Sequence, residues 1–151
     1  MSVDSDLRAG IATRISTILT DAPRPQVFGF PQIRRNAAEF LAAFASPDDP
    51  NFVHAWQVGA TRTAPQQLAS RRELGKVRSY QLSCWYQATN TNDAYTAFLA
   101  TIETVAKDLN ETQFSNQVRG LPIEFTIEIP EAIDEILVYK AVAEITFNCQ
   151  S

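Results

Sequence analysis

The sequence has too few histidine and cysteine residues to build the common catalytic and metal sites. His54 is the only histidine, and Cys84 and Cys149 are the only cysteines in 151 residues. A site that needs two imidazoles is therefore excluded, and no cysteine and histidine spacing matches a zinc site. The five glycines are scattered, so there is no glycine-rich phosphate-binding loop. We predict no catalytic residue, no metal and no cofactor.

The chain also lacks a long apolar run and a strong net charge. Residues 1–20 alternate acidic, basic and hydroxyl side chains, without the apolar run of a signal peptide or a membrane span. The net charge of −4 argues against binding to bulk nucleic acid or to anionic membranes. We expect one domain over residues 1–151, made in the cytoplasm and without membrane contact.

The histidine and both cysteines stand at apolar positions of predicted strands. For Cys84 and Cys149 this favours two buried thiols, with a bridge between neighbouring strands as the alternative. His54 shares a strand face with Trp56, and nothing supplies a nucleophile and an orienting partner. A packed histidine is therefore favoured over a catalytic base.

Residues 93–109 carry the clearest helical pattern. Apolar side chains recur there at steps of three and four, and polar side chains fill the other side, as is typical of a helix lying against a core. Residues 5–20 repeat this pattern and end at the proline-containing segment 21–26. Residues 36–45 predict a third, short helix, followed by a turn-rich stretch.

Four segments alternate apolar and polar residues, which predicts strands. They are residues 52–60, 77–89, 123–129 and 137–147. The first two are near in sequence and are expected to pair as an antiparallel hairpin. We predict an α+β fold with a four-stranded, mostly antiparallel sheet, the N-terminal and the central long helix packed on one face, and a long loop in the first hairpin.

That loop, residues 61–76, is longer than the two to five residues typical of a hairpin, and the segment around it is basic. Its basic residues, with one just beyond it, are Arg62, Arg71, Arg72, Lys76 and Arg78. Residues 103–144, by contrast, hold nine acids against three bases. This segregation lets the basic loop of one copy meet the acidic surface of another, a head-to-tail contact. Separately solvated loops are the alternative.

Two further groups have a structural and a functional interpretation. Glu124 and Glu128 project from one face of a predicted strand, which favours a solvated face over a paired acid and base. Tyr80, Trp85 and Tyr86 offer stacking platforms for bases, but basic residues do not interleave them as in single-strand binders. We interpret the three aromatics as core or interface residues.

The order of elements resembles that of the tail terminator proteins of tailed bacteriophages, also called tail completion or head-tail joining proteins. The resemblance lies in chain size, in the N-terminal helix with an extended arm, in the hairpin 53–89 with its protruding loop, and in the helix 93–109 crossing to a final strand pair. It implies a virion structural protein of the tail or neck, assembled in the host cytoplasm. Such proteins form a hexameric ring that caps the tail tube, ends its polymerisation and joins the tail to the head connector or stopper protein.

The same resemblance implies roles for individual residues. Arg71, Arg72 and Lys76 would contact a neighbouring subunit or the end of the tube, with Arg62 and Arg78 at the base of the loop. The acids that would face the adjoining subunit or the lumen are Glu124, Glu128 and Glu131. DNA would only pass through the lumen.

Other interpretations stay open at this point. The chain is alternatively another neck or tail component, such as a connector stopper, a tube or a baseplate protein. From a different class, it is a small cytoplasmic ligand-binding domain or enzyme with a pocket near His54, Trp56 and Trp85. The proline-rich segment 21–31 is either packed on its own chain or an arm onto a neighbour.

Overall fold

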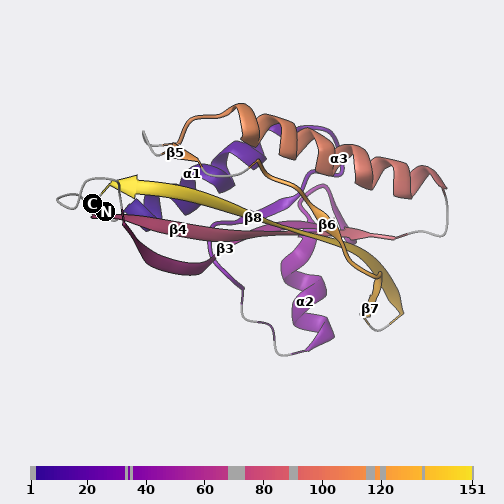
Figure 1. Ribbon diagram of the computed structural model, residues 1–151. Helices are drawn as coiled ribbons and strands as arrows, with labels where there is room; N and C mark the ends of the chain where they lie inside the picture. The colour runs from indigo at the N-terminus through magenta and orange to yellow at the C-terminus, as the bar shows by residue number, and fades with distance from the viewer. Residues whose placement is uncertain are drawn as a thin grey trace.

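The computed structural model describes residues 3–32, 34, 36–67, 74–88, 92–114, 118–119, 122–133 and 135–150. The helices are α1 (Val3–Ile18), α2 (Ala37–Phe44) and α3 (Asn92–Glu111). The long strands are β3 (Asp49–Gln67), β4 (Leu74–Gln87) and β8 (Ile136–Gln150). The short strands are β1 (Gln26–Phe28), β2 (Ala45–Ser46), β5 (Val118–Arg119), β6 (Thr126–Ile127) and β7 (Glu131–Ile133). Together they form an α+β fold (Figure 1).

The sheet is built around β4, which pairs antiparallel with β3 on one side and with β8 on the other. The strand order is β1-β3-β4-β8-β5, and β1 is parallel to β3. Three short strands, β5, β6 and β7, follow one another along the outer side of β8. Short segments thus lie along both edges of the sheet: β5, β6 and β7 beside β8, and β1 and β2 beside the first half of β3.

Helices α1 and α3 cover one face of the sheet (Figure 1). The apolar stripe of α1, with Leu7, Ile11 and Ile15, is fully buried there. An ion pair joins the two helices, because Arg14 donates from Nε and Nη2 to the Asp108 carboxylate at 2.6 and 2.7 Å. The prediction that both long helices share one face is therefore confirmed.

Helix α2 lies on the opposite face, below the sheet in Figure 1. Asn36 caps it, since its side-chain oxygen accepts from the Glu39 backbone N–H at 2.9 Å. Phe40 and Phe44 pack edge-on and tilted against Trp85 of β4. This face is covered by a short helix and an aromatic cluster.

The segment 21–31 packs on its own chain. Its strand β1 pairs with β3, and Arg24 forms an ion pair with Asp48 at 2.7 Å. Pro31 passes so close to β3 that a Cβ on Gly59 would lie 3.1 Å from its ring. A larger residue than glycine would require the Pro31 ring to move by a few tenths of an ångström.

The predicted four-stranded sheet is wrong in detail. The expected strand 123–129 is reduced to β6, because Ile123 turns away into the core and its backbone binds the Asn110 side chain, with Ile123 N donating to Oδ1 at 2.8 Å. The additional parallel strand β1 was not predicted. What holds is the α+β class with a predominantly antiparallel sheet.

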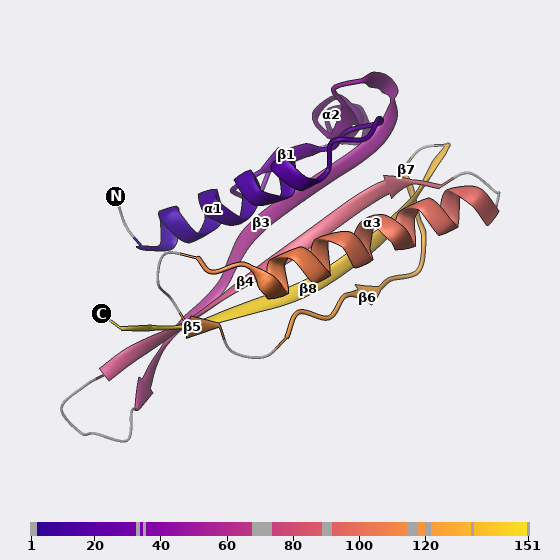
Figure 2. The ribbon, with the colours of Figure 1, turned by 90° about the horizontal axis from the view of Figure 1, so that it is seen from above.

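The predicted loop 61–76 is also wrong in extent. Strands β3 and β4 continue to pair through most of it, as far as Gln67 opposite Leu74. A register shift between Ala60 and Arg62 marks a β-bulge at the start of this extension. Figure 2 shows the resulting hairpin projecting past the C-terminal end of α3.

Candidate interaction surfaces

The basic residues predicted from the sequence fall on the projecting hairpin. Arg62 lies in β3, and Lys76 and Arg78 lie in β4. Arg71 and Arg72 are outside the described residues, between the two strands. We call residues 60–67 of β3 and 74–79 of β4 the basic hairpin. Strand pairing, not a loop, therefore positions three of the five predicted basic residues.

A second surface lies on the other edge of the sheet, where β6 and β7 follow each other. All residues from 126 to 132 are exposed there, and the apolar ones include Ile127 at 42% and Ile129 at 89% relative exposure. Leu137, opposite β7 in the ladder, is 48% exposed. We call residues 126–132 with Leu137 the β6 edge. Isolated apolar residues are common on surfaces, but three large ones on one sheet edge suggest a contact site.

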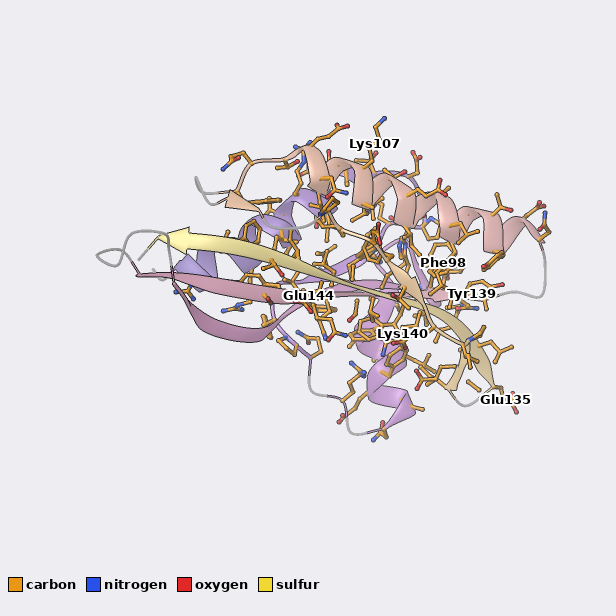
Figure 3. The ribbon with its side chains drawn as sticks, in the orientation of Figure 1. Phe98, Lys107, Glu135, Tyr139, Lys140 and Glu144 are labelled. Carbon is orange, nitrogen blue, oxygen red and sulfur yellow. The ribbon has the colours of Figure 1, made fainter. Side chains whose placement is uncertain are left out.

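The three predicted acids lie on or beside the β6 edge, in different settings. Glu128 forms an ion pair with Lys140 of β8 at 3.7 Å. Glu131 is exposed in β7, whereas Glu124 lines a shallow cleft with Glu144 on the α2 side. Figure 3 shows further negative charge, Glu135, at the turn between β7 and β8, at the far end of the molecule from the basic hairpin. The expected solvated face is confirmed for Glu124 and Glu128.

His54 is packed, as the sequence predicted, and is 3% exposed. Its Nδ1 lies 2.8 Å from the Pro23 carbonyl oxygen and its Nε2 lies 3.2 Å from the indole nitrogen of Trp56. A carbonyl can only accept and an indole N–H can only donate, so the ring is neutral with its proton on Nδ1. Burial lowers the pKa of His54 to about 4. Both nitrogens are occupied, which leaves neither free for proton transfer.

The predicted pocket shared by His54, Trp56 and Trp85 is wrong. Trp85 belongs to the α2 face, whereas the other two residues point to the α1 and α3 face. A cleft of about 320 Å³ does lie beside His54, lined by the end of α1, the turn with Pro23, and Thr101 and Thr104 of α3. It is a small cleft with mixed polar and apolar walls.

The aromatic and sulfur predictions are confirmed where the structure describes them. Tyr80, Trp85 and Tyr86 are buried. Cys84 is a buried free thiol whose pKa is raised by burial. Cys149 stands opposite Lys76 in the ladder, eight residues along β4 from Cys84, so the register excludes a bridge between them.

The comparisons with known proteins leave the family open: no protein-family model and no curated protein sequence matches the chain. Within the described ranges, no group of three or more histidine, cysteine, aspartate or glutamate residues is placed to hold a metal ion. No helix in the described part of the chain is long and apolar enough to cross a membrane.

Sequence reasoning missed the exposed isoleucines of the β6 edge. Residues 123–129 alternate as a strand does, and no local signal shows that the segment lies beside α3, at the edge of the sheet (Figure 2). Proline at position 130 was the available signal, since proline ends pairing at strand ends and edges.

Proposed function

We propose that this protein is a structural subunit of a bacteriophage tail, a tail terminator that assembles into a ring on the end of the tail tube. The ring, of six copies as the resemblance implies, ends polymerisation of the tube protein and joins the tail to the head connector or stopper protein. The protein works by binding and has no chemical step. It is assembled in the host cytoplasm and remains in the virion.

The observation that carries the proposal is the separation of the basic hairpin from the β6 edge. The hairpin projects at one end of the sheet, and the exposed acids Glu128, Glu131 and Glu135 lie towards the other end (Figures 2 and 3). A surface that is complementary to a different part of the same subunit gives a heterologous contact, which closes into a ring when the rotation allows. Opposite charges would orient the subunits as they approach one another.

A ring of this kind ends a tube because its two faces differ. One face matches the last ring of tube protein, and the other offers the connector a new surface without repeating that of the tube. Acidic side chains towards the lumen, of which Glu124 and Glu144 are candidates, would repel DNA phosphates and let DNA pass without adhesion.

Native mass spectrometry tests the proposal, with the protein alone and mixed with phage tail tubes, at low and high salt. We expect a ring-sized species, or a monomer that assembles on tube ends, and weaker assembly at high salt. A salt-indifferent monomer that ignores tubes would overturn it. Arg71→Glu with Arg72→Glu should prevent assembly, whereas the matched charge reversal Lys107→Glu, on the solvent side of α3 in Figure 3, should not.

The cleft beside His54 supports a second candidate, a small ligand-binding domain. Its lining combines hydroxyl groups of Thr101 and Thr104 with apolar side chains, as in small-molecule sites. Thermal-shift screening of metabolite mixtures tests this candidate. Stabilisation that is lost in Thr104→Trp would favour it, and no stabilisation by any mixture would contradict it.

A further inference from the structure

The outer side of β6 presents unpaired backbone groups together with exposed isoleucines. Glu128 N–H donates to the Lys140 carbonyl at 2.9 Å, so the backbone groups of Glu128 point into the sheet. Because neighbouring residues of an antiparallel ladder point their groups in opposite directions, the backbone groups of Ile127, which is paired with Ala141, point outward. No described strand pairs with them there. Such an edge is a template for a further strand.

The opposite edge of the sheet has a longer open stretch. Strand β1 pairs with β3 only from Ala55 to Gln57, and β2 pairs with it only nearer its start. From Val58 to Gln67, β3 has no partner on its outer side among the described residues. Pro65 stands within this stretch, and proline is tolerated in strands where the missing N–H would face solvent. Among the described residues, the sheet therefore has an open stretch of edge on each side.

These edges cannot meet within one molecule, because β4 and β8 lie between them. Their charges are complementary: the open stretch of β3 includes Arg62, and the β6 edge includes Glu128 and Glu131. The two edges also differ from each other, so pairing them gives a heterologous contact. A second copy of this chain therefore fits the β6 edge better than an unrelated strand does.

We infer that the β6 edge binds the open edge of β3 from a second copy, so that the sheet continues from subunit to subunit. Backbone hydrogen bonds give such strand addition its affinity, and the isoleucines and charges give it register. The inference rests on the proposed function, because it identifies the contact that closes the ring. It goes beyond that function by assigning a contact between two strand edges, in addition to the basic residues between β3 and β4.

Ile127→Pro is the sharpest test, because it removes a backbone N–H that points outward and leaves the Glu128 hydrogen bond to Lys140 in place. We expect self-association to weaken by about tenfold or more, with an unchanged circular dichroism spectrum. Ile129→Arg should weaken it similarly, by adding charge to the apolar part of the edge. Ile127→Val, the matched control, should assemble like the parent protein.

Exchanging the charges of the two edges distinguishes a lost contact between subunits from a misfolded subunit. Arg62→Glu and Glu131→Arg should each weaken assembly, and the double variant should recover most of it. A variant that has lost assembly through misfolding would not be rescued by a second change on the other edge. Recovery thus supports direct pairing even if Ile127→Pro proves unstable, and no recovery overturns it.

The outcomes distinguish this inference from the function on which it rests. A ring that still forms in Ile127→Pro and Ile129→Arg overturns strand addition and leaves the terminator proposal standing. Loss of tube binding by an intact ring assigns the β6 edge to the tube, and likewise overturns the inference. A parent protein that is monomeric both alone and on tubes overturns both.

Discussion

The two faces of the sheet are covered in different ways. On the α1 and α3 face, 19 of the described residues form one buried cluster, whereas the cluster under α2 holds six. The smaller cluster is supplemented by cations: the guanidinium of Arg34 lies 5.0–5.2 Å from the ring centroids of Phe40, Phe44 and Trp85. The Lys140 amino group lies 5.4 Å from Trp85.

The different sizes of the two clusters indicate that the α1 and α3 face contributes more to the stability of the fold than the α2 face does. The α1 and α3 face runs along most of the three long strands, so its apolar burial dominates folding. Beyond α2, the other face leaves Gln81 and Glu144 exposed on the strands. In the described part of the chain these side chains are open to solvent, and substitutions on the two faces should differ in their effect on stability.

The largest effect is expected for Phe98→Ala on the first face. Phe98 is fully buried and stacks on Tyr139 at 5.0 Å (Figure 3), so its removal should lower the free energy of unfolding by about 3–5 kcal/mol. Phe44→Ala should cost less, about 3 kcal/mol, because the smaller cluster under α2 can open without unfolding the rest. Urea denaturation measures both. Equal losses in the two variants would contradict the comparison.

An intermediate effect is expected from His54, which belongs to the first face and carries a lowered pKa. Below pH 6.5 the unfolded chain takes up a proton that the folded protein accepts only near pH 4. Stability is therefore complete above pH 6.5 and decreases, by up to about 3 kcal/mol, as the pH falls to about 4. Thermal melts from pH 7.5 to 4 should show this loss.

His54→Asn provides the control for the pH effect, because asparagine does not titrate. Its melting temperature should vary less over the same window. The Asp48 carboxylate does not obscure the result: Arg24 lowers its pKa to about 2, so its contribution is lost only below about pH 3.8. An equal pH dependence in parent and variant would exclude His54 as the cause.

The smallest effect is expected for Arg34→Gln on the second face. Arg34 is exposed, and a cation over aromatic rings at such a site contributes about 0.5–1 kcal/mol. Arg34→Lys should keep less than half of this contribution, because the compact ammonium of lysine lacks the planar guanidinium group that stacks on aromatic faces. Chemical denaturation with closely spaced points can resolve the difference. A loss above 2 kcal/mol would mean that the second face depends on its cation more than the comparison allows.

The helices are predictable from sequence because their patterns are local. The apolar stripes of residues 5–20 and 93–109 need only a 3.6-residue period, and α1 and α3 agree with both. Strand pairing is not local. The parallel pairing of β1 with β3, and the fact that residues 123–125 lie outside the sheet, therefore could not be deduced. The side chain of Asn110 that holds Ile123 is 13 residues away.

The candidate surfaces are predictable only in part, for a related reason. The segregation of basic and acidic residues is visible in the sequence, and it predicted that the segment around residues 61–76 is basic. The pairing of β3 and β4 beyond Ala60 was hidden, because that extension is mostly polar and small and carries no clear apolar alternation. The exposure of Ile129 goes with the place of this segment beside α3, on the outer side of β8 (Figure 2), which is a property of the folded chain alone.

The position of β8 in the chain also sets an order of events during synthesis. Every strand that pairs with β8 precedes it, and about fifty residues separate the end of β4 from its start. At roughly 5–20 residues per second, a ribosome needs several seconds to supply it. Until then β6 has no strand to dock on, so the edge that we assign to assembly does not exist. The open edge of β3 is therefore synthesised before the β6 edge that would bind it in another copy. Only a completed subunit has both edges and can bind a neighbour on each side.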